Sequence, residues 1–369
     1  VERLAAAQKA TAQAGVDTLL ISPGADLRYL TGYHAMPLER LTCLVVPATG
    51  DPVLVVPQLE RPAALASPAA RLGIDILGWA ETDDPFTLVA TLARAAAGGT
   101  PARVAVANRM WAEHAAALRH ALPDTEQDLA GTVMCGLRIR KSAEEIAALR
   151  RAAHAIDRVH QRMGEWLRPG RTEAQVGRDI AEAIVAEGHD ATEFVIVASG
   201  PNGASPHHGV SDRMIERGDP VVVDIGGITH DGYCSDSTRT YLAGGQPDPE
   251  FARYYQVLAH AQQAGRAAVR PGVDAQSIDA AAREVIADAG YGEFFVHRTG
   301  HGIGLETHEE PYLVAGNTEP LAAGMVFSVE PGIYLPGRHG ARIEDIVACT
   351  QTGVDPLNVA RRDLVILEG

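Results

Sequence analysis

Long apolar runs are missing from this chain of 369 residues, which nowhere approaches the roughly 18 uninterrupted apolar residues of a transmembrane helix. We therefore expect no membrane-spanning segment. The first residues, ERLAAAQKATAQAG, also lack the basic start and apolar core of a secretory signal peptide. The sequence thus predicts a protein without a secretory leader.

Cysteine is scarce, and the four thiols are scattered at Cys43, Cys135, Cys234 and Cys349. The absence of a CxxC pair favours free thiols in a reducing compartment, so we expect a cytoplasmic protein. Pairing of these thiols in an oxidising compartment stays open as the alternative.

Basic residues are outnumbered by acidic ones. Lys and Arg total 32 against 47 Asp and Glu, which gives a formal net charge of −15. Such a surface would repel a phosphate backbone and an anionic lipid surface, so we expect neither a nucleic-acid nor a membrane partner. The acid excess is either a plain solubility surface or, in part, a metal site.

The length indicates two domains at roughly 100–200 residues each, although three are allowed. We predict an α/β (or α+β) fold, with one domain over 1–135 and a second over 136–369. In the first domain helices alternate with short apolar strands, and the histidines are isolated, so we expect no catalytic cluster there. The predicted helices are 2–15, 58–67, 84–97 and 111–121, and the predicted strands are 17–22, 41–47, 52–56, 74–79 and 103–106.

Two capping boxes mark helix starts in the second domain. Ser142 with Glu145 predicts a long helix to about Trp166, and Thr172 with Gln175 predicts another to about residue 187. Two further helices are expected over 249–269 and 275–289. Glycines, histidines and acidic residues concentrate between 199 and 345, so the chemistry is expected there.

The segment VVVDIGGITHDGYCSDSTRTY predicts an antiparallel hairpin with its turn at Asp231-Gly232. Such a hairpin can bring Asp224 and Asp236 to one place on one sheet face. Two adjacent carboxylates repel each other unless a cation or a proton lies between them. The pair alone is weak grounds for a metal site.

Three histidines lie within twelve positions in HRTGHGIGLETHEEP: His297, His301 and His308. Glycines among them indicate close backbone approach to a shared cavity, although a glycine-rich loop with exposed histidines is the plainer interpretation. The segment is not an HExxH zinc helix, because Tyr312 stands four positions after His308 and Pro311 breaks the helix. It is not a phosphate loop, because no Lys-Ser/Thr follows the glycines.

Two glutamates interrupt apolar strands of a second predicted hairpin, Glu330 in MVFSVEPGIY and Glu344 in GARIEDIVAC. A buried, ionised and unpaired carboxylate costs several kcal/mol, so each glutamate needs a partner. Together with the aspartate pair and His301 they offer four carboxylates and one imidazole, enough to balance two divalent cations. Such an oxygen-rich set suits Mn²⁺, with Co²⁺ and Zn²⁺ as alternatives.

The ordered contexts VVVDIGG, SDSTRT, TGHGIGLETHEEP, SVEPGIY and RIEDIV resemble the aminopeptidase P/prolidase branch of the "pita-bread" metallopeptidases, family M24. Methionine aminopeptidase and creatinase share that fold. The resemblance covers essentially the whole chain and implies a creatinase-like domain over 1–135 and a pita-bread catalytic domain over 136–369.

The resemblance also implies roles for individual residues. Five side chains correspond to the family's ligands for two metal ions, with Asp236 bridging them, Glu344 as the second bridge and Glu330 also the general base: Asp224, Asp236, His301, Glu330 and Glu344. Arg342 resembles an arginine that orients the carboxylates. His308 and His297 match pocket histidines, and His207 matches a substrate-contacting histidine, with the adjacent His208 as the alternative.

Two departures from the family pattern bear on these expectations. The family usually separates its aspartates by eleven positions, whereas Asp224 and Asp236 are twelve apart, so we expect one extra residue in the turn. Dipeptide-specific prolidases often carry an arginine after the HxxP-like turn to bind the substrate carboxylate, but here Tyr312 follows HEEP. That places Tyr312 in the expected substrate pocket and weakens strict dipeptide specificity.

The implied reaction is hydrolysis of the bond between an N-terminal residue and proline, by a homodimer acting on a proline-containing di- or oligopeptide. A dipeptidase is favoured by the short N-terminal domain, and an aminopeptidase P acting on longer peptides is the alternative. Two remoter alternatives are a metal-free creatinase-like enzyme and a peptide-binding pseudoenzyme.

Overall fold

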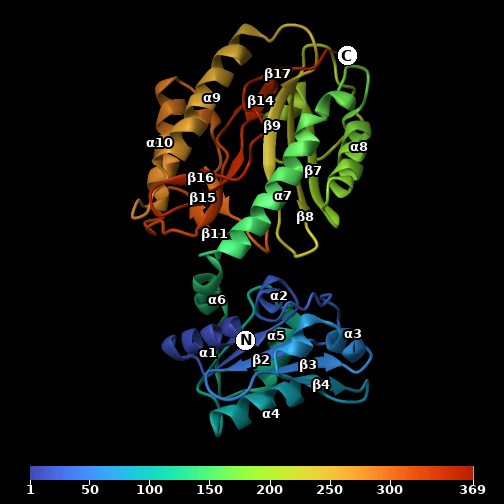
Figure 1. The fold of residues 1–369 in the computed structure, drawn as a ribbon, viewed down its shortest axis with the longest axis vertical. Coiled ribbons are helices and arrows are strands. Elements are labelled where there is room, and N and C mark those ends of the chain that lie inside the picture. Colours follow the sequence, from blue (N-terminus) through green and yellow to red (C-terminus); the bar gives the residue numbers. More distant parts are fainter. Residues whose placement is uncertain (369) are drawn as a thin grey trace. The chain divides into compact units, whose positions relative to one another are not determined.

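The computed structural model describes residues 1–368, which form two compact units, the first from Val1 to Arg138 and the second beginning at Ile139. Figure 1 shows both units in the colours of the sequence. Within the described residues, no helix combines the length and apolar character needed to cross a bilayer.

The first unit contains a six-stranded sheet in the order β4-β3-β2-β1-β5-β6. Leu19 and Ile21 of its central strand pack into one hydrophobic cluster, whereas Leu20 between them packs into another. Because successive side chains of a strand point to opposite faces, the sheet is buried on both sides. Its strands are β1 (Thr18–Ile21), β2 (Cys43–Pro47), β3 (Val53–Pro57), β4 (Asp75–Trp79), β5 (Arg103–Val106) and β6 (Glu126–Leu129).

Helices cover both faces of this sheet. Leu4, Leu27 and Val133 bring α1, α2 and α6 to the cluster of Leu19, while α4 and α5 pack on the other face. The helices are α1 (Glu2–Gln13), α2 (Ala25–Thr31), α3 (Arg61–Ala66), α4 (Pro85–Ala97), α5 (Ala112–Ala121) and α6 (Gly131–Arg138).

The elements predicted for this unit are confirmed to within a few residues, but three elements were missed. Helix α2 has only seven residues, too few for a helical period to stand out. Strand β6 has the sequence EQDL, which lacks the apolar alternation of a half-buried strand. The third, α6, lies in the stretch that was interpreted as a domain boundary.

The second unit contains a four-stranded sheet in the order β17-β9-β8-β7. Val221, Val223 and Ile225 of β8 pack with apolar residues of α7 and α8. Asp224 lies between these residues in the alternation, so it points to the opposite face of the sheet, away from the two helices. The elements are α7 (Ala143–Gln161), α8 (Glu173–Ala186), β7 (Ala191–Ser199), β8 (Pro220–Ile228), β9 (Ser237–Leu242) and β17 (Val365–Ile366).

Both predicted capping boxes are confirmed at the starts of α7 and α8. The first helix is shorter than predicted, because it ends at Gln161 and not near Trp166. A 3-10 turn follows over Met163–Glu165, and Met163 and Leu167 both enter the core of the sheet. Other 3-10 turns are Pro68–Arg71, Gly200–Ala204 and Gly292–Phe294.

A five-stranded sheet, β11-β10-β12-β15-β16, and the hairpin β13-β14 complete the second unit. Figure 1 shows α9 and α10 along one side of the strands of this unit and α7 and α8 along the other. The elements are α9 (Pro249–Ala268), α10 (Ala275–Asp288), β10 (Gly300–Gly302), β11 (Glu309–Leu313), β12 (Val326–Val329), β13 (Gly332–Leu335), β14 (His339–Arg342), β15 (Asp345–Cys349) and β16 (Val354–Pro356).

The second predicted hairpin is built differently from the prediction. We expected one hairpin whose strands carry Glu330 and Glu344. Instead β12 pairs with β15 in one sheet, while β13 and β14 pair separately. Glu330 lies in the break between β12 and β13, and Glu344 in the break between β14 and β15. At Glu330 the chain passes from the β12-β15 sheet to the β13-β14 hairpin, and at Glu344 it returns.

Candidate metal centre

Asp224 and Asp236 share one face of the β8-β9 ladder. Asp224 pairs with Thr238, and Asp236 lies two residues before Thr238, next to the start of β9. Because residues two apart on a strand share a face, the two carboxylates are diagonal neighbours. The ladder runs without a register shift from Pro220 to Ile225, so an extra residue would have to lie in the turn.

Glu344 joins this face through Thr238. The Thr238 hydroxyl donates to Glu344 Oε2 at 2.8 Å, and the Glu344 main-chain N–H donates to Thr238 O at 3.1 Å. One ligand atom from each of Asp236, His301 and Glu344 lies within 4.8 Å of the others, and all three residues are buried. The break between β14 and β15 thus brings a carboxylate to the aspartate pair.

His301 enters from β10 and meets two carboxylates. Its Nε2 is 3.5 Å from Asp236 Oδ2 and 3.2 Å from Glu330 Oε1. Its Nδ1 is 3.1 Å from the main-chain oxygen of Gly302. With a metal ion bound, a proton on Nδ1 would donate to that oxygen and leave the Nε2 lone pair for the metal, as a metal-binding histidine requires. Without a metal ion, a protonated Nε2 can donate to Glu330.

Burial and charge repulsion both oppose ionisation of the clustered carboxylates Asp236 and Glu344. Burial, followed by the nearby carboxylates, raises the pKa of Asp236 and of Glu344 well above the ordinary values. Within the described chain, Asp224 Oδ1 and Glu344 Oε1 are buried without a hydrogen-bond partner. Buried acceptors of this kind are costly unless a cation satisfies them, so the residues fit a metal ion.

Glu330 differs from its neighbours. Burial alone would raise its pKa, but without metal the hydrogen bond and charge of His301, together with the charges of His297 and Arg342, outweigh burial and hold the pKa of Glu330 at about 2. The Ser328 hydroxyl also donates to Glu330 Oε1 at 3.1 Å. Glu330 is therefore kept ionised in this pocket, in contrast to Asp236 and Glu344, whose pKa values are raised.

Arg342 links the cluster to His297. Its Nη2 donates to Asp224 Oδ2 at 2.7 Å, and its Nη1 donates to the Tyr334 hydroxyl at 2.8 Å. That hydroxyl is 2.8 Å from His297 Nε2. The sequence analysis missed Tyr334 and the role of Thr238. A tyrosine within an apolar strand could have indicated a polar neighbour, because a buried hydroxyl needs a hydrogen-bond partner.

A cavity of about 620 Å³ opens over these residues. His308 lies at its wall, with its ring centroid 4.1 Å from that of His301. Nine of the eleven residues named from the sequence line the cavity: His207, Asp224, Asp236, His297, His301, His308, Glu330, Arg342 and Glu344.

The adjacent histidines His207 and His208 have different surroundings. His208 Nε2 is 2.9 Å from Glu173 Oε2, a carboxylate that is fully buried, and His208 does not line the cavity. His207 does line it, beside Pro206. The main-chain oxygen of Pro206 accepts a hydrogen bond from Arg342 Nη1 at 3.2 Å. The structure therefore brings His207, and not His208, to the carboxylate cluster.

Tyr312 pairs with His301 across strands β10 and β11 but does not line the cavity. Its ring instead supports Arg298, whose guanidinium carbon lies 4.2 Å from the ring centroid. Arg298 does line the cavity. The sequence analysis missed this arginine because it concentrated on the histidines on either side.

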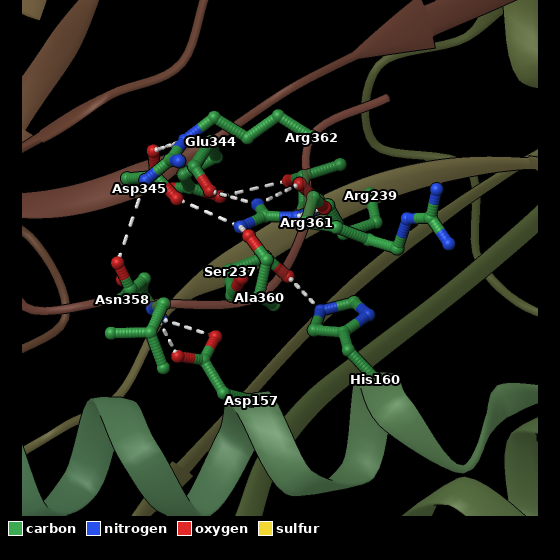
Figure 2. Close-up of polar contacts among 12 residues, drawn as sticks. Asp157, His160, Ser237, Arg239, Glu344, Asp345, Asn358, Ala360, Arg361 and Arg362 are labelled. Atoms are coloured by element: carbon green, nitrogen blue, oxygen red, sulfur yellow. Dashed lines mark hydrogen bonds and ion pairs between the residues drawn. The ribbon is translucent and has the colours of Figure 1, made fainter. Parts of the chain in front are cut away.

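A buried charge network lies behind Glu344, centred on Arg239 and Asp345, which are 4% and 0% exposed at their side chains. Figure 2 shows its polar contacts. Arg239 Nη2 donates to Asp345 Oδ1 at 2.8 Å, and Arg239 Nη1 donates to the main-chain oxygen of Glu344. Arg362 and Gln262 also donate to Asp345. The backbone that carries Glu344 is thus held by a neighbouring ion pair.

Comparison with known proteins agrees with this geometry. Residues 147–351 match metallopeptidase family M24, and residues 3–139 match the creatinase/prolidase N-terminal domain. These matches confirm the predicted fold class, a creatinase-like domain followed by a pita-bread domain.

Similar proteins include dipeptidases. The probable dipeptidase PepE of Mycobacterium bovis is 55% identical over 99% of this chain and 96% of its own length. The Xaa-Pro dipeptidase of Lactobacillus delbrueckii subsp. lactis is 36% identical over 96% of this chain and 95% of its own. The solved structure of dipeptidase PepE from Mycobacterium ulcerans is 56% identical, covers 100% of this chain and 98% of its own, and has a TM-score of 0.94. The chain therefore belongs to metallopeptidase family M24, a family of peptidases that use divalent metal ions.

Proposed function

We propose that this enzyme hydrolyses the peptide bond between an N-terminal residue and proline, with dipeptides as its substrates. The observation that carries the proposal is the convergence of four carboxylates and one imidazole at the wall of a cavity, with two buried acceptors that lack a donor. The names of the relatives, dipeptidase and Xaa-Pro dipeptidase, support the substrate class.

Two divalent ions would be held by five side chains of the second unit: Asp224, Asp236, His301, Glu330 and Glu344. Four carboxylates balance the charge of two such ions, and the oxygen-rich set suits Mn²⁺, with Co²⁺ and Zn²⁺ as alternatives. When bound, the ions lower the pKa of a coordinated water and polarise the substrate carbonyl. Arg342 fixes Asp224, and Thr238 fixes Glu344, in the orientation that this binding needs.

Proton transfer falls to Glu330. Its carboxylate lines the cavity, so it can accept a proton from the attacking water and return it to the leaving nitrogen. An unprotonated amide nitrogen is a very poor leaving group, so this proton is needed for the departure of the proline nitrogen. His308 and His207 line the same cavity and would stabilise the oxyanion and position the proline. His297 is held by Tyr334 and would complete the pocket beside Arg342.

An aminopeptidase P acting on longer peptides is the second candidate. Tyr312 favours it, because it stands where dipeptide-specific prolidases often carry a carboxylate-binding arginine. The dipeptidase remains favoured by the relatives. Cleavage of Ala-Pro compared with Ala-Pro-Ala distinguishes the two, since a dipeptidase cleaves the first far faster.

The proposal is tested with protein loaded separately with Mn²⁺, Co²⁺ or Zn²⁺. We expect two ions per chain by elemental analysis and release of free proline from Ala-Pro, with Ala-Gly as the negative control. Protein that binds two ions yet cleaves no Xaa-Pro peptide would overturn the proposal. Protein that binds no metal would instead support a peptide-binding pseudoenzyme.

We also propose a cytoplasmic homodimer. Cys43, Cys234 and Cys349 are free thiols in the structure, which suits a reducing compartment. The dimer follows from the family resemblance. Light scattering on the purified protein should give twice the chain mass of 39.0 kDa, and a mass equal to one chain would refute the dimer.

A further inference from the structure

A β-bulge near the start of β7 changes which side chains of that strand face the cavity. Two residues that are two positions apart on β7, Thr192 and Phe194, pair with consecutive glycines of β8, so Glu193 between them is the extra residue of the bulge. The Thr192 hydroxyl donates to a main-chain oxygen of α8 at 3.0 Å and therefore faces the helices. Glu193 and Phe194 both line the cavity. The bulge thus adds one side chain, that of Glu193, to the cavity wall.

Glu193 is the acidic residue of the cavity that does not belong to the metal centre. Five acidic residues line the cavity, and the other four are the carboxylates of the metal centre. Glu193 is exposed, and within residues 1–368 its carboxylate makes no hydrogen bond or ion pair. Both of its oxygens can therefore accept hydrogen bonds from a cationic group that enters the cavity with the substrate.

An apolar surface connects Glu193 with the metal centre. Ile196 pairs with Asp224 across β7 and β8, and its side chain lines the cavity. The ring of Phe194 also lines the cavity and lies against Gly226, where a Cβ atom would overlap the ring. From Ile196 to Glu193 the strand advances by up to about 10 Å. The cavity wall is therefore aliphatic beside the metal centre, then aromatic, and finally acidic.

A long basic side chain matches this order of surfaces. Lysine carries its ammonium group at the end of a four-carbon stem, and arginine likewise places its guanidinium beyond an aliphatic stem. The stem would pack on Ile196 and Phe194 while the cation reaches Glu193, and the face of the Phe194 ring would add a cation–π contact. The α-ammonium group of the substrate does not reach Glu193, because only Cα separates it from the scissile carbonyl at the metal centre.

Resting on the proposed function, we infer that Glu193 binds the side-chain cation of the N-terminal residue, so that Lys-Pro and Arg-Pro are preferred substrates. Glu193 is thus a specificity-determining residue that takes no part in the hydrolysis itself. The preference is moderate, because Glu193 is exposed and an exposed ion pair contributes at most about fivefold in affinity.

The test compares Lys-Pro with norleucyl-proline, whose side chain is aliphatic and of similar length but uncharged. Metal-loaded wild-type protein should have a kcat/KM about two- to fivefold higher for Lys-Pro. In Glu193→Gln the two values should become equal, and Glu193→Lys should prefer Glu-Pro over Lys-Pro. The wild-type preference should also weaken as salt is added, because ionic strength screens an exposed ion pair.

A matched variant separates a local contact from the net charge of the protein. Glu182→Gln removes the same charge from an exposed position on α8 that does not line the cavity. It should keep the wild-type ratio of kcat/KM for Lys-Pro to that for norleucyl-proline. If Glu182→Gln lowered this ratio as much as Glu193→Gln does, the preference would come from the overall negative charge and the assignment to Glu193 would be wrong.

The outcomes distinguish this inference from the proposed function. If metal-loaded wild-type protein cleaves neither Lys-Pro nor norleucyl-proline nor Ala-Pro, the proposed function fails. If it cleaves Lys-Pro and norleucyl-proline equally well, or if Glu193→Gln keeps the preference for Lys-Pro, the proposed function stands and the role of Glu193 is refuted.

Discussion

Arg239 and Asp345 form a buried ion pair, with Arg239 Nη2 donating to Asp345 Oδ1 at 2.8 Å. All five guanidinium N–H groups of Arg239 have an acceptor, which is rare because it requires carbonyl oxygens on every side. The remaining acceptors are main-chain oxygens from three segments: those of Thr238, Glu344, Ala360 and Arg361. One side chain thus fixes the strand after Asp236, the break that carries Glu344 and the C-terminal segment.

Replacing Asp345 by Asn should destabilise the protein strongly. The change leaves Arg239 buried without its counter-charge, and breaking a buried pair costs about 3–5 kcal/mol. Urea unfolding measures the loss. Arg361→Gln is the matched control, because its ion pair with Asp363 is largely exposed, at 67% and 60%, and should contribute less than about 1 kcal/mol. Equal effects of the two substitutions would contradict the role of the buried pair.

The β8-β9 hairpin could be predicted from the sequence, because an Asp-Gly turn between two apolar runs is a local signal. The paths of Glu330 and Glu344 were harder to predict. Both lie in apolar segments that read as continuous strands, and only pairing with distant partners shows that each segment passes from one sheet to another. The alternation of apolar and polar residues along a segment does not show that the segment passes from one sheet to another.

The polar side chains behind the ligands could not be predicted for a related reason. Tyr334 contacts Arg342 and His297, and the guanidinium of Arg298 lies over the ring of Tyr312. These contacts depend on how different strands are aligned with one another, which the local sequence does not show. The choice between His207 and His208 likewise depended on Glu173, which lies more than thirty positions away in the sequence.

Metal binding should stabilise the folded protein. A ligand that binds only the folded state contributes about 2.7 kcal/mol at a free concentration one hundred times Kd. We expect Mn²⁺ to raise Tm of the metal-free protein in a concentration-dependent way, as followed by scanning calorimetry, and chelator to reverse the rise. Glu344→Gln should lose most of the effect, whereas Glu319→Gln, an exposed glutamate outside the centre, should keep it. An equal rise in both variants would place the ions elsewhere.

Acid should weaken the fold through His160, which is buried in α7. Burial, and then the charge of Arg239, lower the pKa of His160 to about 3, although Asp345 opposes the shift. The neutral ring contacts the Tyr241 hydroxyl at 2.9 Å and Ser237 O at 3.1 Å. The unfolded chain binds this proton near pH 6.5, so the stabilisation is present above that pH and is lost as the pH falls toward 3.

The contribution of His160 should reach about 2 kcal/mol between pH 6.5 and pH 5, at about 1.4 kcal/mol per unit. Urea unfolding across this range measures the slope. His160→Gln should flatten the slope by that amount, whereas His154→Gln, less buried on the same helix, should leave it as in the wild type. If the free energy of unfolding depended on pH equally in the wild type and in His160→Gln, the pKa of His160 would not be lowered by folding.

Glu173 should control activity from outside the cavity. Its carboxylate accepts hydrogen bonds from Ser199, Asn202, His208 and Ser211, which together hold the loop that presents His207. In Glu173→Gln, one carboxylate oxygen becomes an NH₂ group that faces the donors of the loop. The hydrogen bonds lost in this way should cost about 1–3 kcal/mol of stability. We expect kcat for Ala-Pro to fall about tenfold as the loop shifts, a loss of roughly 1.4 kcal/mol, while the metal content stays at the wild-type value because the ligands lie on other elements. Glu182→Gln, exposed on the same helix, is the control. Loss of metal in Glu173→Gln would mean that Glu173 supports the metal centre itself and not the His207 loop.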